Sequence, residues 1–295
     1  MNGRSHGAAI IRVVAAAVLF STGGAAIKTA SLTGLQVASI RSGIAALAIA
    51  LWLRGRVRLS PQIGGVGAIY AVTLVLFVSS TKLTTAASAI FLQSLAPLYI
   101  VVLAPLLLRE RFQPRDLIFL ATAAIGLVLC VGTGADASAT APDPTTGNAL
   151  GVLCSLSWAF TLLGLRWIER DQQGSGMSAV VVGNLIALLV GLPALFPLPD
   201  ASATDWAALV YLGVIQIGLA YVMLTGAVGH LPALHVSLLL LIEPVLNPIW
   251  TWLVRGENPG IRTLVGGAII ISAAAVHAVY DARTLKTSLR QEGLT

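Results

Sequence analysis

Charged side chains are scarce in this sequence, and their scarcity excludes an ordinary water-soluble domain. Only 10% of the 295 residues are Asp, Glu, Lys or Arg, whereas a typical soluble domain has roughly 25%. Hydrophobic residues make up 57% of the chain, so a water-facing surface of normal area cannot be built from it. The solvent for most of this chain is therefore expected to be lipid.

Residues that support catalysis or metal binding are also few, and no known arrangement of them occurs. The two cysteines lie in apolar segments without metal-ligand or redox spacing, and the four histidines are isolated from one another. The chain has no HExxH pattern and no Walker lysine motif. The sequence thus predicts a non-enzyme without metal or cofactor and gives no sign of ATP as energy source. An integral-membrane enzyme stays the main alternative class, and a channel the second.

Long apolar runs are what the chain has in abundance, and about 20 such residues cross a bilayer as a helix. Polar or proline-rich breaks separate ten of them. The predicted spans are residues 11–29, 35–53, 63–80, 86–108, 117–132, 149–167, 178–196, 206–225, 233–254 and 264–280. The sequence therefore predicts an all-α integral membrane protein with about ten transmembrane helices.

Basic residues are distributed unevenly between the two sides of the membrane. With the N terminus inside, thirteen fall in the cytoplasm: Arg4, Arg12, Arg54, Arg56, Arg58, Arg109, Arg111, Arg115, Arg166, Arg170, Arg283, Lys286 and Arg290. Four fall outside, namely Lys28, Lys82, Arg255 and Arg262. This bias predicts cytoplasmic N and C termini in the inner membrane. Because these residues sit at the edges of apolar segments, the net charge of +6 indicates topology and not a nucleic-acid partner.

The chain also repeats itself at a distance of 147 residues. The two matching sets are Pro97, Glu110 and Arg115, and then Pro244, Glu257 and Arg262. Five spans per unit is an odd number, so the second unit is expected to lie inverted in the membrane. The predicted parts are a first repeat at 1–133, a linker at 134–147, a second repeat at 148–282 and a cytoplasmic tail at 283–295.

Four segments resemble the EamA-type carriers of the drug/metabolite transporter superfamily. They are LTTAASAIFLQSLAPLYIVVLAPLLLRERF from Leu83, LPALHVSLLLLIEPVLNPIWTWLVRGENP from Leu231, FSTGGAAIK from Phe20 and ASIRSGIAAL around Arg41. Within that family the chain is most similar to the YddG-type exporters of aromatic amino acids. The resemblance implies a secondary transporter that exports small metabolites, amino acids first, by alternating access through a central cavity between two repeats. A purine, a sugar or a drug is the alternative solute.

Interrupted helices generally line such a cavity, and prolines predict where they occur. Pro97 in the fourth predicted span removes a backbone hydrogen bond, and so do Pro244 and Pro248 in the ninth. These three prolines are the candidate kink or gating residues. Kinks that serve packing alone are the competing interpretation.

Two charged residues inside spans are the sharpest site candidates, because a charge within the bilayer costs several kcal/mol. Glu243 can pair with an ammonium group of the solute, or carry a proton that couples transport to a proton gradient; a packed, protonated Glu is the alternative. Arg41 can bind a carboxylate, or snorkel outward, or hold a neighbouring carbonyl. Glu110 and Glu257, at helix exits, are expected to form structural ion pairs.

Uncharged polar and aromatic side chains complete the predicted cavity. A solute site needs an apolar wall with a few oriented hydrogen-bonding groups. The remaining cavity candidates are Gln93, Tyr99, Ser79, Tyr221, Asn247 and Trp250. Tyr99 and Trp250 are expected to offer aromatic faces to a flat or cationic solute.

Overall fold

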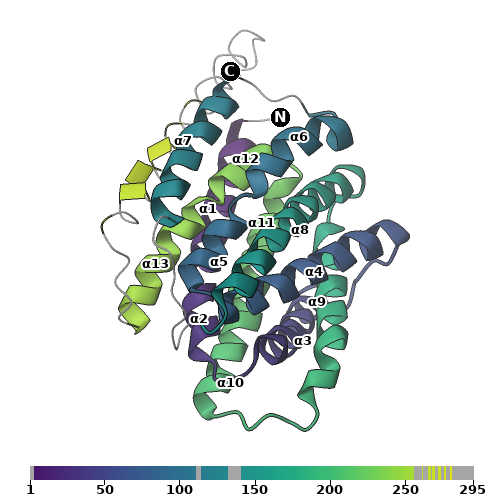
Figure 1. Cartoon of the computed structure of the whole chain (residues 1–295). Coiled ribbons are helices and arrows are strands. Elements are labelled where there is room, and N and C mark those ends of the chain that lie inside the picture. Colours follow the sequence, from purple (N-terminus) through teal and green to yellow (C-terminus); the bar gives the residue numbers. More distant parts are fainter. Residues whose placement is uncertain are drawn as a thin grey trace.

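The computed structural model describes residues 3–110, 114–131 and 141–255, with single positions between 261 and 280. Its regular elements are helices (Figure 1). Eight helices in these residues are long and apolar enough to cross a membrane: His6–Thr29, Gly34–Trp52, Pro61–Leu83, Ala86–Leu108, Pro144–Asp171, Gly176–Leu195, Ala203–Val228 and Ala233–Val254. Each overlaps one predicted span. The tenth predicted span, 264–280, lies outside the described residues except for a few positions.

Several spans consist of more than one helical element. The elements are α1 (Gly3–Ser21), α2 (Gly23–Thr29), α3 (Gly34–Trp52), α4 (Pro61–Leu83), α5 (Ala86–Gln93), α6 (Ala96–Leu108), α7 (Pro114–Val131), α8 (Pro144–Asp171), α9 (Gly176–Gly191), η1 (Leu192–Leu195), α10 (Ala203–Val210), the π-helix η2 (Tyr211–Leu219), α11 (Ala220–Val228), α12 (Ala233–Leu239) and α13 (Ile242–Arg255). The fifth predicted span corresponds to α7, in which the apolar stretch Leu117–Gly126 is shorter than a typical span. The first half of the predicted linker, 134–140, lies outside the described residues, and α8 begins in its second half.

Local sequence signals set where these helices begin. Thr33 and Gln36 form a capping box at the start of α3. Ser60 caps α4 through the backbone N–H of Ile63 at 3.2 Å, just before a proline that suits the first helical turn. Asp143 caps α8, and hydrogen bonds from Thr146 hold the pKa of its carboxyl below the ordinary value. The helix starts are thus fixed by residues that satisfy otherwise unpaired backbone N–H groups.

The fourth and ninth spans are interrupted at equivalent places. The fourth breaks between Gln93 and Ala96, and the ninth between Leu239 and Ile242. The 147-residue repeat also relates the start of α5 to that of α12 and the end of α6 to that of α13. Pro97 and Pro244 follow the breaks, whereas Pro248 lies inside the continuous helix α13. The first span is broken as well, at Thr22 between α1 and α2.

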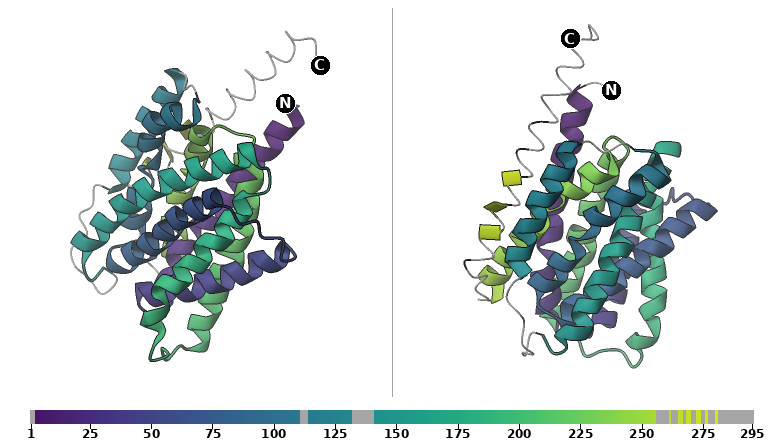
Figure 2. Two further views of the ribbon diagram at one scale, coloured as in Figure 1. Left: turned by 90° about the vertical axis from the view of Figure 1, so that its right-hand side faces the viewer. Right: turned by 45° about the horizontal axis from the view of Figure 1, so that its top comes forward.

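Helices from the two parts of the chain pack against each other. The most extensive contacts are those of α4 with α8 and α9, followed by α3 with α9 and α1 with α11. Both views of Figure 2 place α4 beside α8. Close approach depends on glycines, as in membrane bundles generally. A Cβ at Gly183 of α9 would lie only 2.6 Å from the carbonyl oxygen of Gly67 in α4.

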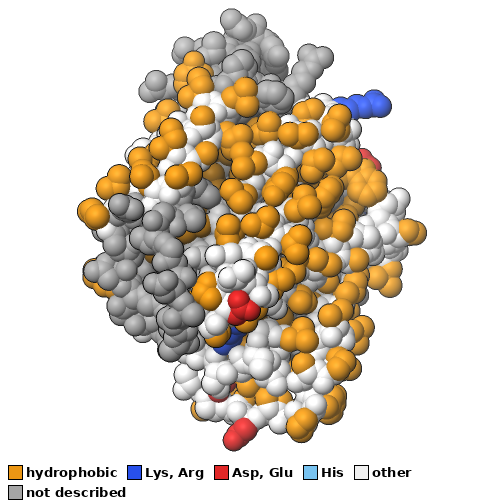
Figure 3. Space-filling view, viewed as in Figure 1, with side chains coloured by type: hydrophobic (Ala, Val, Ile, Leu, Met, Phe, Trp, Pro, Cys, Tyr) orange, Lys and Arg blue, Asp and Glu red, His pale blue; other side chains and the backbone are white. Residues whose placement is uncertain are grey.

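The surface carries the pattern expected of a protein in lipid. Hydrophobic side chains are spread over the described face in Figure 3, and charged ones are few. Large apolar side chains that point outward include Leu51, Leu106, Val128, Leu189 and Leu253, each more than half exposed. An apolar surface of this extent is costly in water but favourable in a bilayer. The fold therefore presents its outside to lipid and leaves polar groups for the interior and the ends.

Candidate functional site

A cavity lies at the centre of the helix bundle, and both halves of the chain form its wall. Its volume is about 40 Å³, which holds a few water molecules and no metabolite. The lining residues are Phe20, Arg41, Tyr70, Thr73, Leu74, Phe77, Gln93, Trp158, Gln216, Ile217, Tyr221 and Glu243. Seven spans contribute to it, from α1, α3, α4, α5, α8, the π-helix with α11, and α13.

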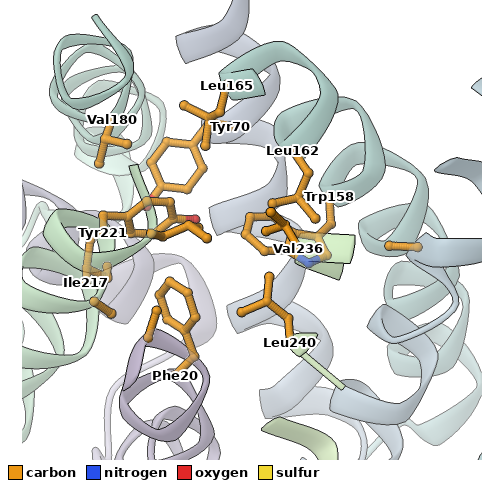
Figure 4. Close-up of a cluster of buried hydrophobic side chains, with 14 of the residues drawn as sticks. Phe20, Tyr70, Trp158, Leu162, Leu165, Val180, Ile217, Tyr221, Val236 and Leu240 are labelled. Carbon is orange, nitrogen blue, oxygen red and sulfur yellow. The ribbon is translucent and has the colours of Figure 1, made fainter. Parts of the chain in front are cut away.

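Four aromatic rings form a continuous part of this wall (Figure 4). Phe20 meets Trp158 edge-on with ring centroids 6.4 Å apart, and it meets Tyr221 at 5.1 Å. Tyr221 in turn lies 4.8 Å from Tyr70. Such tilted and edge-to-face pairs are the favourable arrangements of aromatic rings. The rings join α1, α4, α8 and α11, so the aromatic wall also connects the two halves.

Arg41 reaches the cavity from the middle of α3. Its side chain is 1% exposed, and two of its nitrogens, Nε and Nη1, have no hydrogen-bond partner within the described residues. A guanidinium stays charged in proteins, and a buried charge without a partner costs several kcal/mol. The arrangement leaves donors available for an acceptor that enters the cavity.

Glu243 reaches the same cavity from the first turn of α13. It is 8% exposed, and its backbone N–H donates to the carbonyl of Leu240 at 2.9 Å across the helix break. No Lys, Arg or His of the described chain lies within 4.0 Å of its carboxylate. The start of a helix favours a negative charge. The cavity thus contains one acidic and one basic side chain that do not pair with each other.

A smaller cavity of about 10 Å³ lies between the two helix breaks and adjoins the first. Its lining residues are Gln93, Ser94, Ala96, Pro97, Trp158, Ser237, Leu240, Leu241 and Glu243. Gln93, Trp158 and Glu243 belong to both cavities. The two helix breaks therefore lie beside the central cavity. Irregular backbone is tolerated inside a membrane where it lines a cavity or is buried in protein.

Four of the eight predicted cavity residues line the central cavity. They are Arg41, Gln93, Tyr221 and Glu243. The other four lie elsewhere. Ser79 lies near the C-terminal end of α4, where a Cβ at Gly34 would lie 3.1 Å from its Cα. Tyr99 is half-buried against the hydrophobic core on α6.

Asn247 and Trp250 face the break in the first span and not the cavity. Asn247 is fully buried, and its amide would lie 2.6 Å from a Cβ at Gly24. Trp250 donates from Nε1 to Ser21 Oγ at 2.9 Å. Both belong to the face of α13 that packs on α1 and α2. Neither offers its side chain to the central cavity in this conformation.

Sequence reasoning did not assign Phe20, Thr73 and Trp158 to the site. Phe20 and Trp158 are 138 residues apart, and Lys28 and Arg166 are separated by the same number of residues. This second repeated spacing was the sequence signal that could have indicated Phe20 and Trp158. Thr73 carries no such signal. Its hydroxyl forms a hydrogen bond with the Ser157 hydroxyl at 2.7 Å, and this bond links α4 to α8 at the cavity wall.

An ion pair joins the two halves at the end of the molecule where α6 ends and α12 begins (Figure 1). Glu110 accepts from Arg166 Nε at 2.8 Å and from the backbone N–H of Ala233 at 2.9 Å. Arg166 also donates to the carbonyls of Val228 and Gly229. Glu110 therefore forms the expected ion pair, with a partner from the other half. Glu257 lies outside the described residues.

Hydrogen bonds to Asp205 join the halves at the opposite end. Its carboxylate accepts from the backbone N–H of Ser31 at 2.6 Å and from the Ser31 hydroxyl at 2.9 Å. Nearby, Lys28 is buried at 9% exposure and donates to the carbonyl of Thr84 at 2.7 Å. The two halves are thus connected by polar groups on both sides of the cavity.

Comparisons with known proteins place these features among transporters. The sequence signature of the EamA-like transporter family matches residues 7–132 and 145–278. The pseudopaline exporter CntI of Pseudomonas aeruginosa is 27% identical over 277 residues, with 90% of this chain and 93% of that protein covered. The aromatic amino acid exporter YddG of Ancylobacter novellus is 23% identical, with 74% and 76% covered. One solved crystal structure superimposes with a TM-score of 0.74 at 21% identity, covering 95% of this chain and 99% of its own.

Proposed function

The chain belongs to the EamA-like transporter family of the drug/metabolite transporter superfamily, and on that premise we propose that it exports small metabolites, amino acids first, across the inner membrane. The observation that carries the proposal is the central cavity, which both halves line beside two equivalent helix breaks. Its aromatic wall favours solutes with an apolar or aromatic body. A relative that exports aromatic amino acids supports the same class of solute.

The complete bundle is proposed to have ten transmembrane helices in two inverted repeats, residues 1–133 and 148–282. The matching positions of α5 with α12 and of α6 with α13 support a repeat. The excess of basic residues on one side supports cytoplasmic N and C termini. In this orientation the Glu110 end of the cavity faces the cytoplasm and the Asp205 end faces outward.

Alternating access is the proposed mechanism. A cavity of about 40 Å³ cannot hold an amino acid, so the halves have to move apart before a solute binds. The polar connections through Glu110 and through Asp205 lie at opposite ends. Opening toward the cytoplasm separates the first, and opening outward separates the second. The carrier moves the solute without altering it chemically.

We propose that transport is coupled to protons, because Glu243 places a carboxyl group in the central cavity. A carboxyl in a membrane interior that alternates between its neutral and charged forms can carry a proton through the transport cycle. Exchange and facilitated diffusion are the competing modes. A pH gradient imposed across proteoliposomes discriminates among them.

Transport by the purified protein in proteoliposomes tests the function. Radiolabelled phenylalanine, leucine, a purine and a sugar are compared, with protein-free liposomes as the control. We expect saturable uptake of the amino acids and accelerated exchange when unlabelled amino acid is present on the far side. Uptake of the purine or the sugar alone would overturn the assignment of amino acids as the solute, whereas the assignment of the protein as a carrier would remain. Non-saturable flux near the rate of free diffusion would indicate a channel.

A further inference from the structure

We infer that Arg41 and Glu243 are the two poles of one binding site for a zwitterionic solute, whose carboxylate binds Arg41 and whose ammonium group binds Glu243. This inference rests on the proposed transport function. It narrows the solute to compounds that carry both charges, such as free α-amino acids, and it assigns each charge to a residue. Organic amines without a carboxylate and carboxylates without an amine are then poor solutes.

The first step of the argument is that the two charges share one cavity without neutralising each other. Both side chains line the central cavity, and they are its charged residues. No ion pair within 4.0 Å joins them or links either of them to another described residue. The other buried acidic side chains of the described chain do have partners: Glu169 accepts from the backbone N–H groups of Gly174 and Gly176, and Asp205 accepts from Ser31. The cavity is therefore neutral as a whole but separated into a positive and a negative part.

The second step concerns the free energy of these charges. Arg41 is 1% exposed and has two nitrogens without a hydrogen-bond partner among the described residues. Leaving a buried charged group unsatisfied costs about 1–3 kcal/mol or more. A guanidinium fork matches a carboxylate with two parallel hydrogen bonds, and a carboxylate matches an ammonium group. A zwitterion satisfies both poles at once and leaves the filled cavity neutral.

The third step is the shape of the remaining wall. Phe20, Trp158 and Tyr221 surround the cavity with rings whose closest centroids are 5.1 Å apart. These rings offer no charge, so they receive the uncharged part of the solute. An α-amino acid has this composition, with two charges on one carbon and a side chain beside them. A solute that lacks either the carboxylate or the ammonium group would leave one pole unsatisfied.

The test examines each pole by itself, with solute analogues that lack one charge and protein variants that lack one charge. Purified wild-type carrier in proteoliposomes takes up labelled phenylalanine in competition with phenylethylamine, which lacks the carboxylate, or phenylpropionate, which lacks the amine. The same three-way comparison is made on the leucine skeleton. For the wild type we expect the amino acid to compete at least about tenfold better than either analogue, since each lost charge leaves a buried partner unpaired.

Two variants give opposite patterns if the assignment is right. Arg41→Gln lowers the affinity for phenylalanine and abolishes its advantage over phenylethylamine, while the advantage over phenylpropionate remains. Glu243→Gln abolishes the advantage over phenylpropionate, while the advantage over phenylethylamine remains. Arg41→Lys retains a positive pole and keeps a reduced preference for the carboxylate. Thermal unfolding of each purified variant verifies that it is folded.

Glu169→Gln is the matched control, because it makes the same chemical change at a buried carboxylate outside the cavity. Glu169 accepts from the backbone N–H groups of Gly174 and Gly176, and it is not among the residues that line the central cavity. Its substitution is expected to leave both preference ratios unchanged. If Arg41→Gln and Glu243→Gln lower the affinity for the amino acid and for both analogues by one common factor, the two-pole site is wrong. The proposal that the protein transports amino acids would remain. If the wild type transports no zwitterion, the inference and the amino-acid assignment both fall.

Discussion

Single glycines decide how closely the helices around the cavity approach. Gly183 of α9 faces α4, where a Cβ would lie 2.5 Å from Tyr70 Cδ1 and 2.6 Å from the carbonyl oxygen of Gly67. A backbone carbonyl cannot move aside as a flexible side chain can. The contact therefore positions Tyr70, one of the four aromatic rings of the cavity.

Gly183→Ala is expected to destabilise the protein by about 1–3 kcal/mol, the usual effect of overpacking a dense interior. Thermal unfolding of the purified protein in detergent measures the change. Gly64→Ala in the first turn of α4 is the matched control, since nothing lies within 4 Å of a Cβ there and alanine favours a helix. An unfolding temperature for Gly183→Ala equal to that of Gly64→Ala would contradict the prediction.

Not every residue of the site was accessible to sequence reasoning. Glu243 and Arg41 stood out because a charge inside an apolar run is costly and so has to face a cavity or a partner. Asn247 also lies within a span, but it packs against Gly24 and does not line the central cavity. The sequence specifies which residues share a helix face, whereas the neighbouring helix that this face meets depends on the packing of the whole bundle.

At the scale of elements, the sequence signals of helix interruption and repetition coincide with the architecture. The breaks before Pro97 and Pro244 lie 146 residues apart, within one residue of the 147-residue spacing of the prolines. The break at Thr22 in the first span had no proline to indicate it. Its glycines instead accommodate amide side chains, Gln216 against Gly23 and Asn247 against Gly24, which come from distant helices.

The ion pair between Glu110 and Arg166 holds the end of α6 to α8 and to the first turn of α12. Both side chains are 13% exposed, so solvent weakens the pair only in part. We expect Glu110→Gln to lower the free energy of unfolding by about 2 kcal/mol, as for a charged hydrogen bond of this kind. A double-mutant cycle with Arg166→Gln, followed by thermal unfolding, isolates the contribution of the pair.

Asp171→Asn serves as the control for that cycle, because Asp171 is an exposed acid at the end of α8 and forms no ion pair with the described residues. It is expected to change stability by less than about 0.5 kcal/mol. Strictly additive effects of Glu110→Gln and Arg166→Gln would show that the pair contributes nothing to stability.

At the scale of the whole molecule, polar connections at both ends make the conformational balance accessible to experiment. A cysteine in place of Thr73, with the native cysteines removed, reports on access to the cavity from outside the cell. Asp205→Asn is expected to raise its labelling by a membrane-impermeant maleimide several-fold in intact cells, because the Ser31 connection is weakened.

Glu110→Gln acts at the opposite end and is expected to lower that labelling or leave it unchanged. Labelling of inverted vesicles should show the reverse order of the two variants. An equal increase for both variants from the outside would contradict separate opening of the two ends. The opposite order throughout would reverse the proposed orientation of the chain.

The length of α8 has a consequence for the membrane itself. Its 28 residues extend about 42 Å at 1.5 Å per residue, against a hydrocarbon thickness of about 30 Å. At the average tilt of about 20°, about seven residues in total project beyond the two faces of the hydrocarbon, and Arg166 through Asp171 are the last six of the helix. We expect thicker bilayers with longer acyl chains to bring Arg166 closer to the hydrocarbon, where its ion pair with Glu110 becomes harder to break. We therefore expect lipid composition to adjust how readily this end of the carrier opens in the proposed transport cycle.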